Sequence, residues 1–109
     1  MDLDSVYPDL NALTRSLAKL VYEDLLNDER LSNIKPQFEQ SLNVFYLTAD
    51  KETIKQVAFI PLPHSKDIDF GLIKLLQQKL ESSRICVAIV DNTGNILYYQ
   101  IDEGFNSDT

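Results

Sequence analysis

Apolar positions along this chain change their spacing from helical to alternating and back. From Pro8 to Leu26 they recur every three or four residues, which predicts an amphipathic helix, capped by Asp4 or Ser5 and with Pro8 in its first turn. The apolar stripe of that helix consists of Leu10, Leu13, Leu17, Leu20, Val21 and Leu25. Such a stripe either covers a sheet of the same domain or binds a partner helix.

After this helix the apolar residues change to a period of two, which is typical of half-buried strands. Residues 42–47 and 55–60 are predicted to be two strands, joined by a turn over residues 48–53. A weaker strand is expected over residues 33–38. Pro36 within it cannot donate to a ladder, so this strand should lie at an edge of the sheet.

Helical spacing returns after Pro61 and Pro63, which are expected to end the preceding strand. A second helix should begin near Ser65 or Asp67. Its buried face is expected to consist of Ile68, Leu72, Ile73, Leu76 and Leu80.

The most apolar run of the chain follows. Ile85–Val90 is rich in β-branched residues, which predicts a strand covered on both faces. The next five residues form a turn in which Gly94 fits the left-handed position of a type I turn with a bulge, so that Ile96–Ile101 pairs back antiparallel. The resulting order α-β-β-β-α-β-β predicts an α+β fold, a mostly antiparallel or mixed sheet covered by two helices.

The length and composition of the chain indicate how many domains it forms and which partners its charge favours. A length of 109 residues suits one domain over residues 1–109, with loose tails at 1–5 and 106–109. A net charge of −7 and scattered Lys and Arg residues argue against tight RNA binding by this chain alone. No run approaches the roughly 20 apolar residues that span a bilayer, and the acidic start is unlike a secretory signal, so we expect a soluble, intracellular protein.

Candidate catalytic chemistry is sparse. Cys86, the one cysteine, lies inside the apolar strand and is expected to be a core residue. His64, the one histidine, lies among prolines and is expected to be a solvated linker residue. One His and one Cys do not make a metal site, and the three glycines are too far apart for a phosphate-binding loop. We therefore expect no catalytic residue, no metal and no cofactor.

Residues 84–101 carry a resemblance to a known family through the run R-I-C-V-A-I-V-D-N-T-G-N-I-L-Y-Y-Q-I. A strand ending in Ala-Ile-Val, an acidic turn with a glycine and a following Ile-x-Tyr-Tyr resemble the C-terminal signature of the tRNA-splicing endonuclease family. The continuation Asp102–Phe105 is similar to the smallest, non-catalytic subunit of its eukaryotic members. The resemblance implies the fold of the family's C-terminal domain and a structural role in excising introns from precursor tRNA.

Catalytic members of the family cleave RNA with a tyrosine, a histidine and a lysine, and the lysine lies just ahead of the apolar strand. In this chain Arg84 stands at that position, and arginine is a poor substitute for a lysine that exchanges a proton. The Gly- and Tyr-rich segment that carries the other two residues is missing around His64. The resemblance therefore transfers no catalytic role to this chain.

Assembly is what the resemblance does imply. In the family, the last strand pairs with the equivalent strand of a neighbouring subunit, and the acidic turn before it inserts into a groove on another subunit. The corresponding partner-binding residues are Asp91, Asn92, Thr93, Gly94, Asn95, Leu97, Tyr98, Tyr99 and Ile101. Residues 96–101 lack the lysine or proline that usually protects an edge strand, so the isolated chain is expected to be a homodimer. In the alternative, the first helix covers this strand and the turn is an ordinary surface hairpin.

Together these features predict a structural subunit of a tRNA-splicing endonuclease, paired with a catalytic subunit and meeting precursor tRNA only through the complex. Its place is expected to be the nucleus or, alternatively, the cytoplasm, with the complex on the mitochondrial surface. Two other functions stay open. One is a free-standing α+β module that dimerises and binds an unrelated protein; the other is a divergent nuclease that uses His64, Tyr46 or Tyr99, and Arg84.

Overall fold

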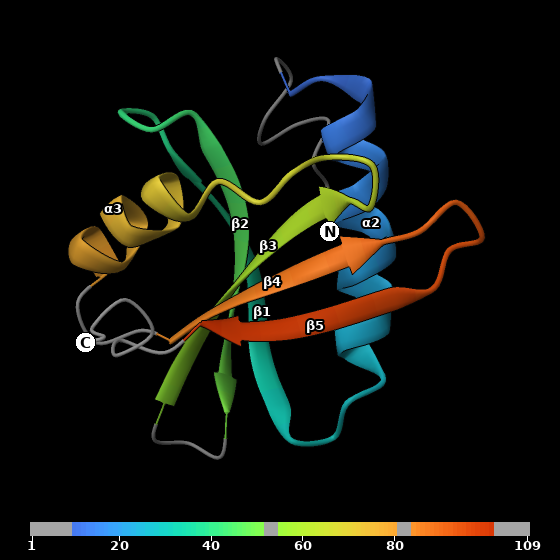
Figure 1. Cartoon of the computed structure of the whole chain (residues 1–109). Helices are drawn as coiled ribbons and strands as arrows, with labels where there is room; N and C mark the ends of the chain where they lie inside the picture. Colours follow the sequence, from blue (N-terminus) through green and yellow to red (C-terminus); the bar gives the residue numbers. More distant parts are fainter. Residues whose placement is uncertain (1–9, 52–54, 81–83, 102–109) are drawn as a thin grey trace.

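A five-stranded mixed sheet forms the centre of the protein, with a helix on each face (Figure 1). The structure, a computed structural model, describes residues 10–51, 55–80 and 84–101. Its elements are α2 (Ala12–Leu26), β1 (Leu31–Glu39), β2 (Val44–Lys51), β3 (Lys55–Pro63), α3 (Phe70–Leu80), β4 (Arg84–Val90) and β5 (Ile96–Ile101). This order confirms the predicted α-β-β-β-α-β-β succession and the α+β class.

The strands lie side by side in their sequence order, from β1 at one edge to β5 at the other. Only β3 and β4 run parallel, and α3 is the crossover that a parallel pair requires. The strand that contains Pro36 is an edge strand, as predicted. The apolar run Ile85–Val90 lies in β4, inside the sheet, and its first four residues are buried, which confirms the strand covered on both faces.

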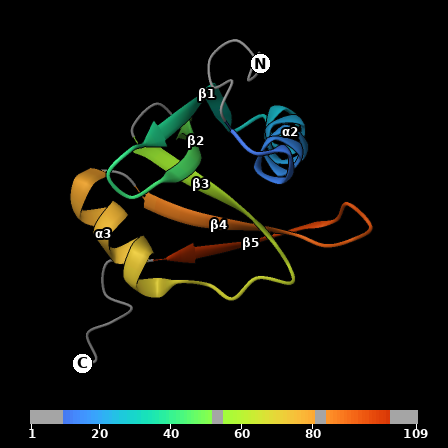
Figure 2. The same cartoon turned by 90° about the horizontal axis from the view of Figure 1, so that it is seen from above.

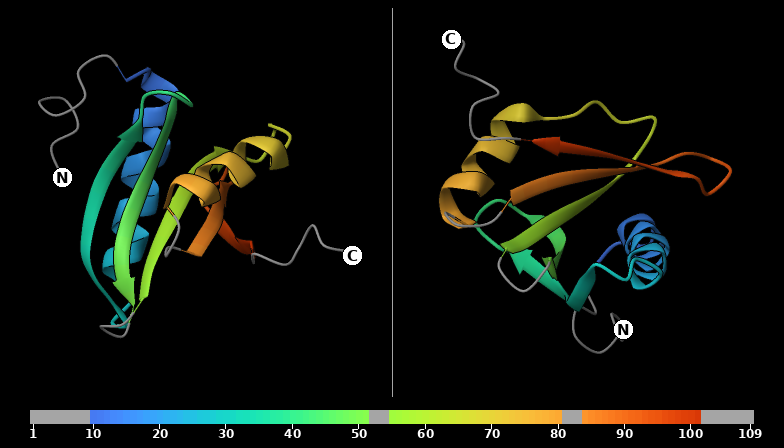
Figure 3. Two further views of the ribbon diagram at one scale, coloured as in Figure 1. Left: turned by 90° about the vertical axis from the view of Figure 1, so that its left-hand side faces the viewer. Right: turned by 90° about the horizontal axis from the view of Figure 1, so that it is seen from below.

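Alternation along β4 divides its side chains between two cores. Cys86, Ala88 and Val90 belong to the core under α2. Ile85 and Val87 belong to the core under α3. Seen from above, α2 and α3 lie on opposite sides of the strongly twisted sheet (Figure 2), and two further views show the same three layers (Figure 3).

The first helix begins later than the sequence predicts. Asn11 caps it, because its side-chain oxygen accepts a hydrogen bond from the Thr14 N–H at 2.8 Å while its own backbone is extended. The caps expected at residues 4 and 5, and Pro8, lie outside the described residues. Asn11 falls inside the range predicted for the helix, and in the structure it is the residue that precedes the first helical turn.

Part of the predicted stripe of α2 is not buried. The side chains that face the sheet are those of Leu17, Ala18, Val21 and Leu25. Leu13 and Leu20 remain 57% and 40% exposed, because they lie on the flank of the helix and not on its sheet-facing side. The helix therefore covers the sheet as predicted, with a narrower apolar contact.

The strands expected to be half-buried, residues 42–47 and 55–60, are buried on both faces instead, since residues 44–49 and 57–60 are all buried. Both strands also continue further than predicted. β2 runs to Lys51, through part of the expected turn over residues 48–53, of which residues 52–54 lie outside the described residues. β3 includes Pro61 and Pro63, which were expected to end it. Pairing with β2 stops at Phe59, so beyond that residue β3 has only β4 as a neighbour.

The prolines are tolerated because of the direction of their nitrogens. The His64 N–H donates to the Val90 carbonyl of β4 at 2.9 Å. Since backbone groups alternate along a strand, the nitrogens of Pro63 and Pro61 point to the opposite side, where no ladder needs a donor. Prolines at two alternate positions thus indicate that a strand is paired along one side only at those positions.

The second helix also begins later than predicted. Asp69, and not Ser65 or Asp67, caps α3, because its Oδ1 accepts from the Leu72 N–H at 3.0 Å. The predicted buried face is confirmed. Ile73 and Leu76 are buried, and the other predicted members pack against them while partly exposed.

Candidate functional site

All predicted partner-binding residues lie in the β4–β5 hairpin. Within its turn, the Asp91 N–H donates to the Asn95 carbonyl at 2.9 Å, and the Gly94 N–H donates to the Asp91 carbonyl at 3.2 Å. Gly94 has a φ of 90°, in the left-handed region. These features confirm the predicted type I turn with a bulge.

The carboxylate of Asp91 holds this turn together. Its Oδ1 accepts hydrogen bonds from the Thr93 hydroxyl at 2.7 Å, the Thr93 N–H at 2.9 Å and the Asn95 N–H at 2.9 Å. These bonds, those of Thr93 foremost, lower the pKa of Asp91, with a smaller contribution from His64. Their stabilisation is complete above the ordinary carboxyl pKa of 3.8 and is lost as the pH falls through the lowered value. Within the described residues none of these bonds uses Oδ2, which stays available to a partner.

We expect Gly94→Ala to lower the free energy of unfolding by about 1 kcal/mol. A Cβ at this position would meet no atom within 4 Å, so the left-handed backbone is the whole reason. Gly71→Ala is the matched control, because that glycine lies in α3 and alanine favours helix, so it should stabilise by roughly 0.5 kcal/mol. Urea titrations of both variants measure the difference, and equal effects would contradict the turn geometry.

Two side chains of β5 are free to meet a partner. Leu97 and Tyr99 are 60% and 50% exposed, on the face of the sheet that α3 covers only in part. Ile101 shares that face, but it is buried in the α3-side core. The predicted turn residues Asn92, Thr93, Gly94 and Asn95 are all exposed.

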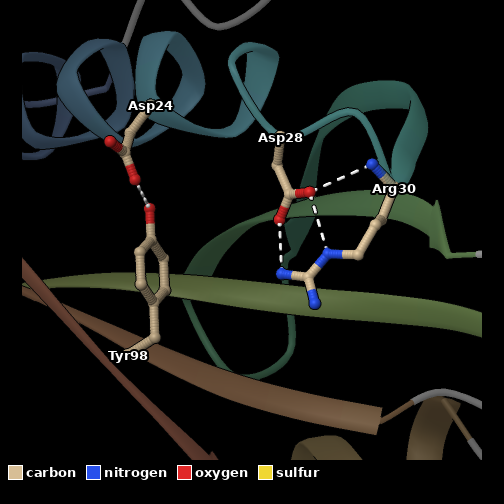
Figure 4. A network of polar contacts seen from close by, with 4 residues as sticks. All are labelled: Asp24, Asp28, Arg30 and Tyr98. Carbon is tan, nitrogen blue, oxygen red and sulfur yellow. Dashed lines mark hydrogen bonds and ion pairs between the residues drawn. The ribbon is translucent and has the colours of Figure 1, made fainter.

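Tyr98 is engaged on the other face. Its ring packs edge-to-face on Phe59 with 5.9 Å between the centroids, and its hydroxyl donates to Asp24 Oδ2 of α2 at 2.5 Å (Figure 4). Burial of the ring, followed by this hydrogen bond, raises the pKa of Tyr98. One face of β5 therefore packs against α2 through Tyr98, as in the alternative to a partner site. The other face is exposed at Leu97 and Tyr99 and buried at Ile101.

The turn also decides which backbone groups of β5 point outward. In an antiparallel pair, hydrogen-bonded residues alternate with residues that point away. Asp91 and Asn95 are a hydrogen-bonded pair, so the next such residues of β5, spaced by two, are Leu97, Tyr99 and Ile101. Their N–H and C=O groups are used by β4.

The intervening residues Ile96, Tyr98 and Gln100 therefore direct their N–H and C=O groups to the outer edge. The Val90 carbonyl is consistent with this alternation of backbone directions. It accepts a hydrogen bond from the His64 N–H, on the β3 side of β4, and not from Ile96, its register partner in β5. No strand of the described residues pairs with that edge. Ile96 is missing from the predicted site, although the parity set by the turn was a signal that could have identified it.

Residues of the alternative nuclease site do not come together. His64 is held at Val90, at one end of β4, and Arg84 is the first residue at the other end. β4 is seven residues long, so those two ends lie about 20 Å apart. Tyr46 is buried in the α3-side core, and Tyr99 is exposed on β5. These four residues therefore do not form one reaction site.

Two further properties bear on function. Among the described residues there is no group of three or more His, Cys, Asp or Glu side chains that could hold a metal ion. Neither described helix is long and apolar enough to cross a membrane.

Comparison with models of known protein families finds a match. Residues 20–108 match the family model described as "Sen15 protein". The matched region includes the C-terminal part of α2, from Leu20 on, all five strands and α3. No curated protein matched the chain.

Proposed function

Because this chain belongs to the Sen15 family, the small structural subunit of the tRNA-splicing endonuclease, we propose that it joins that enzyme through the outer edge of β5. It is a non-catalytic subunit and partners with other subunits of the complex. The observation that carries the proposal is the direction of the backbone at Ile96 and Tyr98, whose polar groups face an edge that no described strand occupies.

An open edge of this kind suits a partner strand. Edge strands in soluble proteins usually carry lysine, proline or a bulge, and β5 carries none of them between Ile96 and Ile101. Exposed Leu97 and Tyr99 add apolar surface beside that edge. The proposed occupant is the last strand of a catalytic subunit, which extends the sheet, and a second copy of this chain takes its place when the protein is alone.

The turn Asp91–Asn95 is the second proposed contact. It is ordered by its own hydrogen bonds and projects beyond the sheet (Figure 1), so it can enter a groove without rearrangement. The proposed groove is basic, because Asp91 keeps Oδ2 available. Membership of the family supports the nucleus as the place where this complex processes tRNA.

Asp91→Asn tests the docking role of the turn. An amide keeps an oxygen that can accept the hydrogen bonds now made to Oδ1, but it removes the charge. We expect a nearly unchanged thermal transition and recovery of the endonuclease complex weakened about tenfold or more. The measurement is co-purification of the other subunits with the tagged chain at a series of concentrations.

Asp67→Asn serves as the control, because Asp67 is an exposed carboxylate of the segment before α3 and takes no part in the hydrogen bonds of the turn. It should assemble like the wild type. If Asp91→Asn assembles equally well, the turn has no docking role. If the wild-type chain brings down no endonuclease subunit, the free-standing module is favoured.

A further inference from the structure

A cavity of about 510 Å³ opens on the α2 side of the sheet, where α2 ends. It arises because the sheet is longer than the helix that covers it. The apolar floor is formed by Val57, Phe59 and Cys86, residues of the α2-side core. Burial raises the pKa of Cys86 to about 11, which reflects an environment poor in water at the base of the cavity.

Along two strands, a basic residue lies next to this apolar floor. Along β2 the α2-side row reads Phe45, Leu47, Ala49 and then Lys51. Along β4 the same row ends in Cys86 and then Arg84. Both rows turn from apolar to basic where the cover of α2 stops, so Lys51 and Arg84 stand on the rim of the cavity.

The acids of the rim are already engaged within the protein (Figure 4). Asp24 accepts the Tyr98 hydroxyl. Asp28 accepts from the Arg30 N–H at 3.0 Å, Nε at 3.1 Å and Nη2 at 3.0 Å, and the Arg30 side chain accordingly lowers the pKa of Asp28.

Lys51 and Arg84 differ from these acids. Neither of the two cations forms an ion pair with another described residue. The lining thus carries the cations Arg30, Lys51 and Arg84 against the carboxylates of Asp24 and Asp28, so the rim keeps a net positive charge above an apolar floor, in a chain whose net charge is −7.

We propose that this cavity receives an apolar side chain of an acidic peptide segment of a partner protein. The side chain occupies the floor, and a carboxylate beside it meets Lys51 and Arg84. Nucleic acid fits less well, because the floor is apolar and the net charge of the chain repels phosphate. The proposal is independent of strand pairing at β5, so each can fail without the other.

Small probes of matched shape test the charge requirement on the full-length chain. The probes are 3-phenylpropionate and the neutral 3-phenylpropanamide, titrated while the backbone amide signals of Phe59, Cys86 and Tyr98 are followed by NMR. We expect the carboxylate to bind with a dissociation constant on the order of millimolar and the amide to bind about fivefold more weakly.

Charge variants locate the binding. Lys51→Gln and Arg84→Gln should each weaken binding of 3-phenylpropionate about threefold, as for partly exposed charge pairs. Lys74→Gln, on the exposed side of α3, is the control and should leave binding unchanged. Equal binding of the amide and the carboxylate, or no shift of these signals with either probe, would overturn the proposal.

Other occupants give different results. A short oligouridylate that shifts the same three signals more strongly than 3-phenylpropionate would assign the cavity to RNA and overturn the proposal. Signals that shift with protein concentration alone, and then no longer respond to the probe, would assign it to a second copy of the chain.

Discussion

Replacing Tyr98 by proline is expected to abolish self-association at micromolar concentration, whereas Tyr98→Ala is expected to retain most of it. Both variants lose the ring that packs on Phe59 and the hydroxyl that bonds Asp24. Only the proline also loses the N–H that β5 directs to its outer edge. In a two-fold pair this removes one hydrogen bond per chain, which amounts to about 2 kcal/mol or roughly a 30-fold weaker dissociation constant.

Sedimentation velocity of the wild type and the two variants measures this difference, and circular dichroism shows that each variant is folded. A wild-type chain that is monomeric at micromolar concentration would contradict self-pairing through β5. So would a folded Tyr98→Pro variant that dimerises as strongly as Tyr98→Ala.

Tyr99 illustrates why the structure is needed to choose this variant. From the sequence, Tyr98 and Tyr99 are equivalent candidates for the edge. The turn and the register direct the Tyr99 backbone to Val87 of β4. Proline at Tyr99 would therefore break the hairpin itself, and its loss of association would say nothing about the interface.

Features that depend on a few neighbouring residues were predicted well. The strand covered on both faces at β4, the edge position of the strand with Pro36 and the bulged turn at Gly94 all follow from local chemistry. Each of them needs only the residue types within one element and the geometry of a strand or turn.

Features that depend on contacts between different helices and strands could not be predicted from the local sequence. Pro61 continues β3 because the pairing of β3 with β2 has already stopped at Phe59, and this is a property of the pairing between strands. Leu20 is exposed because the sheet contacts a narrower face of α2 than the stripe offers. The cavity at the end of α2 could not be predicted either, since its lining comes from α2, all five strands and the connection after α2.

The structure separates the predicted partner-binding residues into exposed and buried ones. The turn and β5 were chosen through a resemblance, and the structure shows which groups there are exposed. Leu97 and Tyr99 present side chains, while Ile101 and the ring of Tyr98 belong to the cores. Burial separates these roles, and burial depends on the two helices.

Leu76→Ala is expected to lower the free energy of unfolding by about 2–5 kcal/mol, and Leu75→Ala by less than about 1 kcal/mol. These leucines are neighbours on α3 with opposite surroundings, since Leu76 is 0% exposed and Leu75 is 48% exposed. The first substitution removes apolar contacts and leaves a cavity in the α3-side core. The second removes side-chain atoms that remain largely in water.

Loss of the Leu76 packing should also destabilise β5, the strand of the proposed interface, because α3 contacts the end of β5. Gln77 Nε2 donates to the Ile101 carbonyl at 3.3 Å, and Ile101 is buried in the same core as Leu76. A domain of this size has about 5–15 kcal/mol of stability, so the Leu76 variant should show a much lower urea midpoint with an unchanged slope. Hydrogen exchange should then be faster at Ile101 than in the Leu75 variant. Equal urea midpoints for the two variants would show that α3 does not pack on the sheet through Leu76.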